Sequence, residues 1–317
     1  MFYKNKKVLV TGGTGFVGTN IVEALLKEKA KIIVPLHKRK PIIKSKSITF
    51  IKADLTKQSD CLKVCKGVDY VFHAAGEVSA AAATVNNPMP PIVANLILTA
   101  QILEAAWSCN VARILIFSSS TGYPLAKHPL KENEMWGKEP PAVYFGYGWM
   151  RRYFEKLAAF VHSRSSTKIA LVRPTAVYGR YDDFNPKTSH VIPALIRRAL
   201  AKENPFVVWG TGKEVRDFLH ISDLAKGCLL ALEKYAVCDP VNIGCGRSIT
   251  VKEIVTIVLQ AAGYTGATIQ FDTSKPATVP YRVIDTSKGK RVLGFSPVIN
   301  IEDGLRDTIN WYKRTLP

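Results

Sequence analysis

A glycine-rich segment directly follows the first apolar run of the chain. Residues 7–11 (KVLVT) have the pattern of a buried strand, and residues 20–29 carry apolar side chains at helical spacing. Between them, Gly12, Gly15 and Gly18 have the spacing that allows a tight turn, close approach of the backbone to phosphate and close packing of helix on strand. This strand–turn–helix context predicts a dinucleotide site, with the pyrophosphate at the helix N-terminus. The loop residues expected to contact the dinucleotide are Gly12, Thr14, Gly15, Phe16, Val17 and Gly18.

Strand and helix patterns alternate through the first half of the chain. Such alternation, with continuously apolar strands, is typical of a parallel sheet covered by helices on both faces. We therefore predict an α/β fold, a Rossmann doubly wound parallel sheet. Further strands are expected at 32–36, 48–53, 70–74, 113–118 and 168–173, and helices at 95–110 and 147–161.

The pattern becomes less regular after residue 174, which predicts a second, smaller unit. We expect a dinucleotide-binding Rossmann domain at 1–178, to which 220–243 returns, and a discontinuous substrate-binding lobe at 179–219 and 244–317. The active cleft is expected between the two. Within the smaller lobe the pattern predicts helices at 191–202, 251–262 and 301–313 and strands at 206–209 and 267–271.

The end of the second strand bears on the choice between NAD and NADP. An Asp or Glu at that place binds the ribose 2′-hydroxyl, whereas a basic residue accommodates a 2′-phosphate. Residues 34–40 read VPLHKRK and contain no acid. His37, Lys38 and Arg39 therefore favour NADP(H), with NAD(H) and a merely solvated basic loop as the alternatives. Asp54 and Leu55, just after the third strand, are expected at the adenine edge.

The formal charge of +19 is the one unusual global property of the 317 residues. A basic balance favours anionic partners, namely nucleic acid, acidic membranes or phosphorylated small molecules. The basic residues are spread along the chain, with short clusters only at 4–7 and 38–40, and no nucleic-acid-binding motif accompanies them. We therefore expect a phosphate-rich small ligand and no nucleic acid.

The composition also bears on membranes, metals and location. No segment approaches the roughly 18 uninterrupted apolar residues that span a bilayer, and the N-terminal residues carry no signal-peptide pattern. Cys61 and Cys65 stand one helical turn apart, but no second pair or nearby His completes a metal site. We predict no membrane association, no metal and reduced thiols in the cytoplasm.

Several longer motifs carry a family resemblance. The motifs are HAAG at 73–76, FSSS at 117–120, a tyrosine-led helix at 147, RPTAVYG at 173–179 and DFLHISDLA at 217–225. Together with the glycine loop they resemble, over the whole chain, the extended short-chain dehydrogenase/reductases that act on nucleotide sugars, the NAD-dependent epimerase/dehydratase family. Residues 118–132, 145–152, 181–198 and 208–220 are most similar to its GDP-L-fucose synthase branch.

The resemblance implies a reaction and partners. It implies an NAD(P)-dependent oxidoreductase, or an epimerase, that acts at C4 of a nucleotide sugar, namely a GDP-deoxyhexose or a related GDP-sugar. An epimerase or dehydratase acting on another nucleotide is an alternative. It further implies a homodimer that pairs through the helices near 95–110 and 147–161. Further cofactor contacts are implied for Ala74, Ala75, Gly76, Tyr147, Arg151 and Pro174.

The resemblance assigns the proton transfer to Tyr147, with Ser119 polarising the C4 oxygen. A free tyrosine has a pKa of about 10, so a nearby cation is needed for it to act at neutral pH. The family places a lysine four residues after the tyrosine, and this chain has Arg151, which keeps the charge but differs in shape and hydrogen bonding. Two interpretations stay open: an active enzyme of altered efficiency, and a cofactor-binding protein that has lost turnover.

The resemblance also implies residues for epimerisation and for substrate binding. His190 matches a histidine that serves epimerisation in the related enzymes, but Thr121 stands where they have a cysteine. A threonine hydroxyl is too weak an acid to serve unaided as a base toward carbon, which favours simple C4 oxidoreduction or a different base. Arginine suits a diphosphate through its forked donors, and tryptophan can stack on a base. The matching substrate positions are Val191, Leu195, Arg198, Trp209, Arg216 and Arg282.

Overall fold

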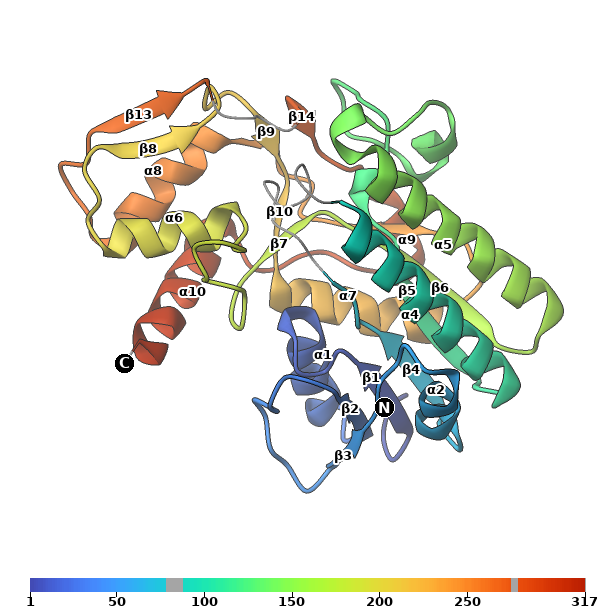
Figure 1. The fold of residues 1–317 in the computed structure, drawn as a ribbon. Coiled ribbons are helices and arrows are strands. Elements are labelled where there is room, and N and C mark those ends of the chain that lie inside the picture. Colours follow the sequence, from blue (N-terminus) through green and yellow to red (C-terminus); the bar gives the residue numbers. More distant parts are fainter. Residues whose placement is uncertain (78–87, 275–278, 317) are drawn as a thin grey trace.

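The computed structural model describes residues 1–77, 88–274 and 279–316, and its centre is a seven-stranded sheet in the order β11-β6-β5-β4-β1-β2-β3 (Figure 1). Every neighbouring pair in this sheet is parallel. This confirms the predicted α/β Rossmann fold. The strands are β1 (Lys7–Thr11), β2 (Lys31–Leu36), β3 (Ile48–Lys52), β4 (Tyr70–His73), β5 (Arg113–Phe117), β6 (Lys168–Pro174) and β11 (Val241–Ile243).

The order of the strands reverses between β1 and β4. From β1 the chain runs outward to β2 and β3, and then crosses back to β4 on the other side of β1. In open α/β sheets, ligands bind outside the carboxyl ends of the strands at such a reversal. The glycine loop follows β1 and residues 74–77 follow β4, so both segments lie at this place.

Helices cover both faces of the sheet because successive strand residues point to opposite faces and both sets are apolar. Val8 and Val10 pack on one side with α1 (Phe16–Lys27) and α7 (Ile221–Lys234). Leu9 packs on the other side, against three further helices of the described chain. These helices are α2 (Gln58–Cys65), α4 (Met89–Ser108) and α5 (Phe145–Arg164).

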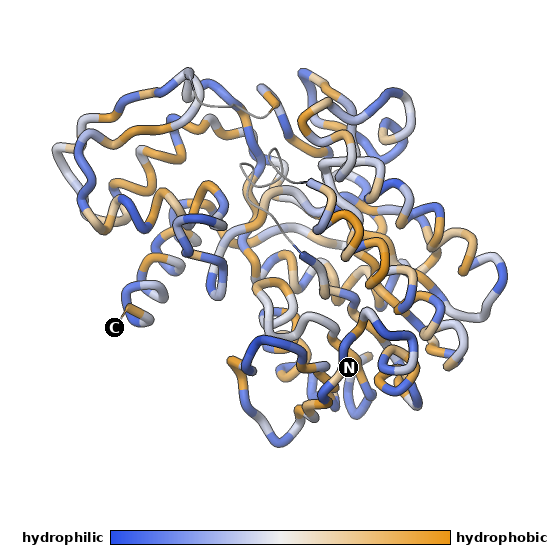
Figure 2. The backbone as a smooth tube through the Cα atoms, in the orientation of Figure 1, coloured by the Kyte–Doolittle hydropathy of each residue, from blue (hydrophilic) through white to orange (hydrophobic). Residues whose placement is uncertain are grey.

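The helix α4 is long and apolar enough to cross a membrane by length and composition alone. It nevertheless packs against α2 and α5, and Ile102 and Leu103 are fully buried in the core beneath it. Figure 2 shows apolar residues along α4, as its burial on the sheet requires. One side of α4 thus packs in the core on the sheet, whereas Met89, Val93 and Ile97 on its outer side are exposed.

A separate apolar cluster forms the centre of the smaller lobe. It is built from α6 (Val191–Leu200), α8 (Val251–Ala262), α10 (Ile301–Thr315) and the parallel pair β8 (Phe206–Trp209) and β13 (Ile269–Asp272). Local sequence sets the ends of α8: Thr250 and Glu253 form a capping box, and Gly263 ends the helix with a φ of +70°. From this second core we infer that the smaller lobe is a unit of its own.

Short elements join the two parts, and the sequence pattern did not predict them. The strand β9 (Val215–Arg216) pairs with β12 (Ile249–Thr250) and β14 (Tyr281–Arg282), and β7 (Ala176–Tyr178) pairs with β10 (Phe218–His220). The helix α9 (Ser287–Leu293) packs on α7 and β11. The predicted range of the smaller lobe includes α9. In the structure this helix packs on the Rossmann part, because its contacts are with elements distant in sequence.

Candidate active site

The glycine loop is shaped by two positions where a side chain has no room. Gly12 has a φ of +66°, and a Cβ on it would lie 2.6 Å from the carbonyl oxygen of Ala74. A Cβ on Gly18 would lie 2.1 Å from the carbonyl oxygen of Gly12. The backbone therefore passes directly under the loop that follows β4. The helix α1 begins at Phe16 with Gly15 as its N-cap and no capping side chain, so its first N–H groups are available to a phosphate.

The segment after β2 brings a cation to this loop. His37, Lys38 and Arg39 are all exposed. Arg39 Nη1 lies 3.9 Å from the place where a Cβ on Gly15 would stand. A guanidinium at that position can reach a phosphate held by the glycine loop.

The residues expected at the adenine edge are only partly available. Asp54 accepts hydrogen bonds from the backbone N–H and hydroxyl of Thr56 at 3.1 and 2.7 Å, and these bonds lower the pKa of its carboxyl. Leu55 is 7% exposed and belongs to the core cluster on the α2 side of the sheet. Its side chain is thus placed for packing, and a cofactor contact from Leu55 would involve its backbone.

The ends of β1 and β4 are locked together by a neutral histidine. His73 Nδ1 lies 2.9 Å from Thr11 Oγ1, and its Nε2 lies 3.3 Å from Thr99 Oγ1 on α4. Burial, assisted by the Arg151 charge, lowers the pKa of His73 to about 3. Thr11 Oγ1 also accepts from the backbone N–H of Ala75 at 3.1 Å. The HAAG motif therefore uses its histidine to fix the loop, a role that sequence reasoning did not assign.

Residues 76 and 77 are held by Asn95, a residue that the sequence analysis missed. Its Oδ1 accepts from the backbone N–H of Glu77 at 3.0 Å, and its Nδ2 donates to the Glu77 carbonyl at 2.8 Å. A Cβ on Gly76 would lie 2.6 Å from Asn95 Oδ1, so this glycine is needed for the contact. A lone Asn inside an apolar helix gave no signal by itself. Residues 78–87, which follow, lie outside the described part.

Tyr147 stands in the first turn of α5, where that helix meets the turn after β5. Its hydroxyl donates to the carbonyl oxygen of Glu77 at 3.5 Å. The neighbouring Gly148 packs on the η1 turn (Ser120–Gly122): a Cβ there would lie 2.9 Å from the Thr121 carbonyl oxygen. Ser119 begins that turn, and its Oγ accepts from the backbone N–H of Thr121 at 3.2 Å. The phenol and the predicted serine thus belong to two elements in direct contact.

Arg151 lies one helical turn after Tyr147 and is fixed in place. Its Nη1 donates to the carbonyl oxygen of Phe117, the last residue of β5, at 3.0 Å. Its guanidinium also lies over the Phe154 ring, 5.6 Å from the centroid. Burial lowers the pKa of Arg151 to about 10, against the opposing effect of Tyr147. The group therefore stays charged at neutral pH, which satisfies the need for a cation near the phenol.

His190 is the N-cap residue of α6, and its imidazole is 46% exposed. Its Nδ1 lies 3.9 Å from Asp182 Oδ1, and this carboxylate raises the pKa of His190. Asp182 Oδ2 is buried without a hydrogen-bond partner among the described residues. The arrangement favours the protonated imidazole, which can serve as an acid.

Two arginines lie side by side on paired strands. Arg216 on β9 and Arg282 on β14 are in register. Arg282 is 7% exposed, and its Nη1 donates to the carbonyl oxygens of Ser120 and Tyr123 at 2.9 and 3.0 Å. Its Nε and Nη2 are buried and have no partner among the described residues. Burial, together with the nearby charge of Arg216, lowers the pKa of Arg282 to about 10, against the opposing effect of Tyr144.

This pair is suited to a diphosphate. Unused N–H donors on a buried cation are costly unless a ligand accepts from them. A diphosphate supplies both the negative charge and the oxygen acceptors that a guanidinium fork binds. Because Arg282 is bonded to Ser120, a diphosphate bound there would lie next to the turn that begins at Ser119.

The other predicted substrate residues divide into two groups. Val191 and Trp209 are 42% and 52% exposed and are accessible to a ligand. Leu195, in contrast, is 3% exposed and packs in the core of the smaller lobe. Arg198 donates to Glu203 Oε2 at 2.6 Å and lies over the Phe206 ring. These placements count against direct ligand contacts by Leu195 and Arg198, because the fold already uses both side chains.

Three further positions singled out in the sequence, Pro174, Cys61 and Cys65, lie in regular elements of the sheet and of α2. Pro174 ends β6, is half-buried and pairs with Ile243 of β11. Cys61 and Cys65 are buried on α2, and burial raises the pKa of Cys61 to about 11. Within residues 1–77, 88–274 and 279–316, no group of three or more His, Cys, Asp or Glu side chains could hold a metal ion.

Comparison with known proteins places this arrangement among nucleotide-sugar enzymes. Residues 8–244 match the NAD dependent epimerase/dehydratase family. The chain is 32% identical to the probable GDP-L-fucose synthase 1 of Oryza sativa subsp. japonica, over 98% of this chain and 92% of that protein. It is also 32% identical to the GDP-L-fucose synthase of Escherichia coli (strain K12), over 77% of this chain and 80% of that protein. Among solved structures, the UDP-glucose 4-epimerase of Thermotoga maritima with UDP-glucose superposes with a TM-score of 0.87 at 25% identity, covering 98% of this chain and 100% of that chain.

Proposed function

Because the chain belongs to the NAD dependent epimerase/dehydratase family, we propose that it is an NAD(P)-dependent oxidoreductase or epimerase acting at C4 of a GDP-activated sugar. The family relationship covers residues 8–244, and relatives named as GDP-L-fucose synthases match most of the chain. The observation that carries the proposal is the Arg216–Arg282 pair, since Nε and Nη2 of Arg282 have no partner among the described residues and lie beside the turn that begins at Ser119.

The proposed chemistry divides the work between cofactor and protein. The nicotinamide, when bound, gives or accepts a hydride at C4 of the sugar. Tyr147 exchanges the proton of the C4 oxygen, and Ser119 donates a hydrogen bond to the same oxygen. Arg151 favours the ionised phenol through its charge, one turn away on α5. We propose simple C4 oxidoreduction, with His190 as an auxiliary acid, because the hydroxyl of Thr121 is a weak replacement for a thiol.

The alternative of a protein without turnover is not favoured. It rested on Arg151 in place of lysine, and the guanidinium retains its charge and is anchored on Phe117 at 3.0 Å. The relatives that match nearly the whole length of the chain are named as enzymes.

Turnover can be tested by following the absorbance of the reduced cofactor with GDP-4-keto-6-deoxy-mannose. We expect Tyr147→Phe to lower kcat by at least about a hundredfold, since proton transfer contributes 10²–10⁴ in typical enzymes. Tyr153→Phe is the matched control, because Tyr153 lies on the same helix and is 52% exposed. Full activity of Tyr147→Phe would falsify the assigned role.

We also propose a preference for NADP(H), supported by the position of Arg39 beside the glycine loop. The change Arg39→Gln removes a charged donor, which is expected to raise the KM for NADPH about tenfold and leave that for NADH within about twofold. Both constants come from steady-state kinetics with each cofactor. An equal change for the two cofactors would contradict a contact with the 2′-phosphate.

A homodimer in the cytoplasm is the proposed physical state. Apolar side chains on the outer sides of α4 and α5, which pack against each other, are exposed and can be covered by a second copy. Sedimentation of the purified chain checks this, and a monomer at micromolar concentration contradicts it. The exposed apolar residues on the outer sides of α4 and α5, which form the proposed dimer surface, are Met89, Val93, Ile97, Phe145, Trp149 and Phe160.

The six free cysteines are consistent with a reducing compartment, which fractionation of the host cells tests.

A further inference from the structure

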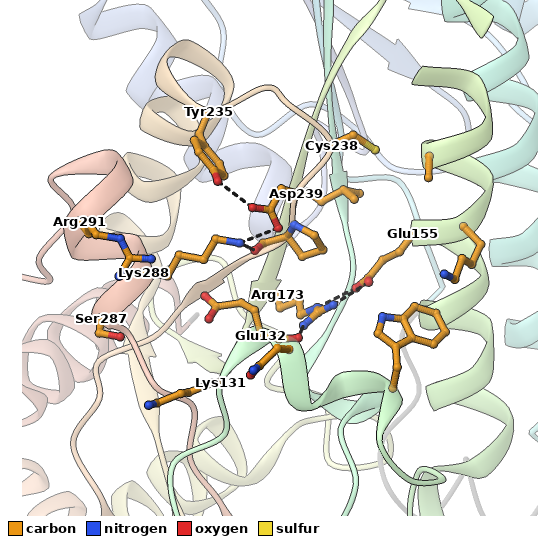
Figure 3. A pocket seen from close by; sticks show the side chains of 16 residues that line it. Lys131, Glu132, Glu155, Arg173, Tyr235, Cys238, Asp239, Ser287, Lys288 and Arg291 are labelled. Atoms are coloured by element: carbon orange, nitrogen blue, oxygen red, sulfur yellow. Dashed lines mark hydrogen bonds and ion pairs between the residues drawn. The ribbon is translucent and has the colours of Figure 1, made fainter. Parts of the chain in front are cut away.

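A cavity with no residue of the glycine loop in its lining lies beside β6 at the β11 edge of the sheet. Its walls come from α5, the η2 turn (Glu132–Trp136), the segment 235–240 and α9 (Figure 3). Its volume of about 640 Å³ lies within the range of small-molecule sites. None of the residues assigned above to cofactor, catalysis or substrate lines it. The cavity is thus distinct from the proposed active site in its lining residues.

Of the three carboxylates that line this cavity, Glu155 and Asp239 are paired with cations, and Glu132 Oε1 accepts from the backbone N–H of Asn242 at 2.9 Å. Arg173, on the floor, donates from Nε and Nη2 to both oxygens of Glu155 at 2.8 and 2.7 Å. Lys288 Nζ lies 2.6 Å from Asp239 Oδ1, and the hydroxyl of Tyr235 donates to Asp239 Oδ2 at 2.7 Å. Figure 3 shows the contacts of Asp239 and the Arg173–Glu155 pair as two separate groups. The negative groups therefore leave little attraction for a cationic ligand.

Several cations remain without such a partner. Lys131, Lys156 and Arg291 line the cavity and form no ion pair within the described part of the chain. Lys156 Nζ lies over the Trp136 ring, 4.4 Å from its centroid, and is held there by the ring. Figure 3 places Lys131 and Arg291 on the same side of the cavity, with Glu155 and its helix opposite.

The balance of charge points to an anionic ligand. The lining holds Lys131, Lys156, Arg173, Lys288 and Arg291 against the carboxylates of Glu132, Glu155 and Asp239. A concave site with an excess of one charge concentrates ligands of the opposite charge. Phosphate accepts hydrogen bonds from both lysine and arginine. A phosphorylated ligand therefore matches a cavity of this size that is lined by three cations without ion-pair partners in the described residues. A long nucleic acid would instead need a basic stripe along the surface.

We propose that this cavity is a second ligand site, which binds a phosphorylated small molecule through Lys131, Lys156 and Arg291. The proposal does not depend on the reaction proposed above, because the two sites share no residue. The ligand places its phosphate oxygens among the three cations, with Trp136 as an aromatic wall. The Arg173–Glu155 pair forms the floor and fixes α5 to β6.

Inorganic pyrophosphate is a suitable probe. Its binding is followed by NMR through the indole N–H signals of the five tryptophans in the full chain. The signal of Trp136 is identified by its loss in Trp136→Phe, and the titration is run at constant ionic strength. We expect a saturable shift of the Trp136 signal. The change Arg291→Gln weakens the apparent affinity about tenfold, as the loss of charge-assisted hydrogen bonds to phosphate implies.

Matched variants separate this site from other basic surface. Lys290→Gln is the control, because Lys290 is the exposed neighbour of Arg291 on α9 and does not line the cavity. It should keep the wild-type affinity, whereas Lys131→Gln should weaken binding as Arg291→Gln does. Arg282→Gln should leave the Trp136 response unchanged, which separates this cavity from the proposed substrate site. A missing shift, or one that is equally strong in Arg291→Gln, overturns the proposal.

Discussion

Arg173 and Arg282 are both buried arginines, yet the structure treats them in opposite ways. All nitrogens of Arg173 donate, to Glu155, to the hydroxyl of Tyr123 and to the carbonyl oxygen of Glu132. Arg282 donates only from Nη1 and leaves Nε and Nη2 without a partner in the described residues. The partners raise the pKa of Arg173, whereas burial lowers that of Arg282 to about 10.

The difference separates a cation that holds the fold from one that is prepared for a ligand. A fully paired buried charge fixes the elements that carry its partners, here α5 and β6. A partly paired buried charge costs stability until a ligand supplies the missing acceptors. The two arginines are connected, because Tyr123 accepts from Arg173 with its hydroxyl and from Arg282 with its carbonyl oxygen.

The largest effect is expected where the complete pair is broken. Glu155→Ala leaves Arg173 buried without its carboxylate, which should lower the free energy of unfolding by about 3–5 kcal/mol. Chemical denaturation followed by circular dichroism measures this loss. The control is Glu104→Ala, since Glu104 is exposed on α4 and should change stability by less than about 0.5 kcal/mol. Equal losses in the two variants would show that the pair does not hold the fold.

A smaller and different effect is expected at the incomplete site. Arg282→Gln removes donors to the diphosphate, so the KM for the nucleotide sugar should rise about thirtyfold, equivalent to about 2 kcal/mol. Stability should fall far less than in Glu155→Ala. Arg306→Gln serves as the control, since Arg306 is exposed and pairs with Asp303 on α10. An unchanged KM in Arg282→Gln, together with a large loss of stability, would show that Arg282 holds the fold and does not bind the ligand.

The third prediction, which concerns pH dependence, extends the comparison to a negative charge. Asp217 is fully buried and accepts from the backbone N–H groups of Cys245 and Gly246, and burial raises its pKa to about 7. Between about pH 4 and pH 7 the folded protein therefore holds a proton that the unfolded chain has lost. This group makes the free energy of unfolding fall as the pH rises through that range, by at most about 1.4 kcal/mol per pH unit.

The change Asp217→Asn removes this titration. The free energy of unfolding should then fall less steeply between pH 5 and pH 7, as measured by denaturation at several pH values. A slope identical to that of the original chain would mean that Asp217 is charged in the fold at those pH values.

Much of the fold could be predicted from the chain alone, because its signals are local. The run KVLVT and the glycines after it define β1 and the turn, and the strands of the large sheet were placed to within a residue or two. The helices α1, α4 and α5 begin four, six and two residues before their predicted starts, at Phe16, Met89 and Phe145. The short strands β9, β12 and β14 were missed because two-residue strands carry no periodicity and exist only through pairing.

The candidate site was predictable as a set of positions, although not as a set of roles. The motifs located Tyr147, Ser119 and Arg151, but gave no sign that His73 would be neutral and buried between Thr11 and Thr99. Arg198 looked equivalent to Arg282 in the sequence. In the structure it is held by Glu203, five residues later, whereas Arg282 reaches Ser120, 162 residues earlier.

The sequence by itself determined the doubly wound sheet, the dinucleotide loop and membership of the nucleotide-sugar family. These follow from periodicity, from glycines at fixed spacing and from contiguous motifs, all of which act over a few residues. Only the tertiary structure decided which buried charges are paired and which await a ligand. The reason is that the cost of burying a charge depends on the acceptors that folding brings within about 3 Å, and these come from distant parts of the chain.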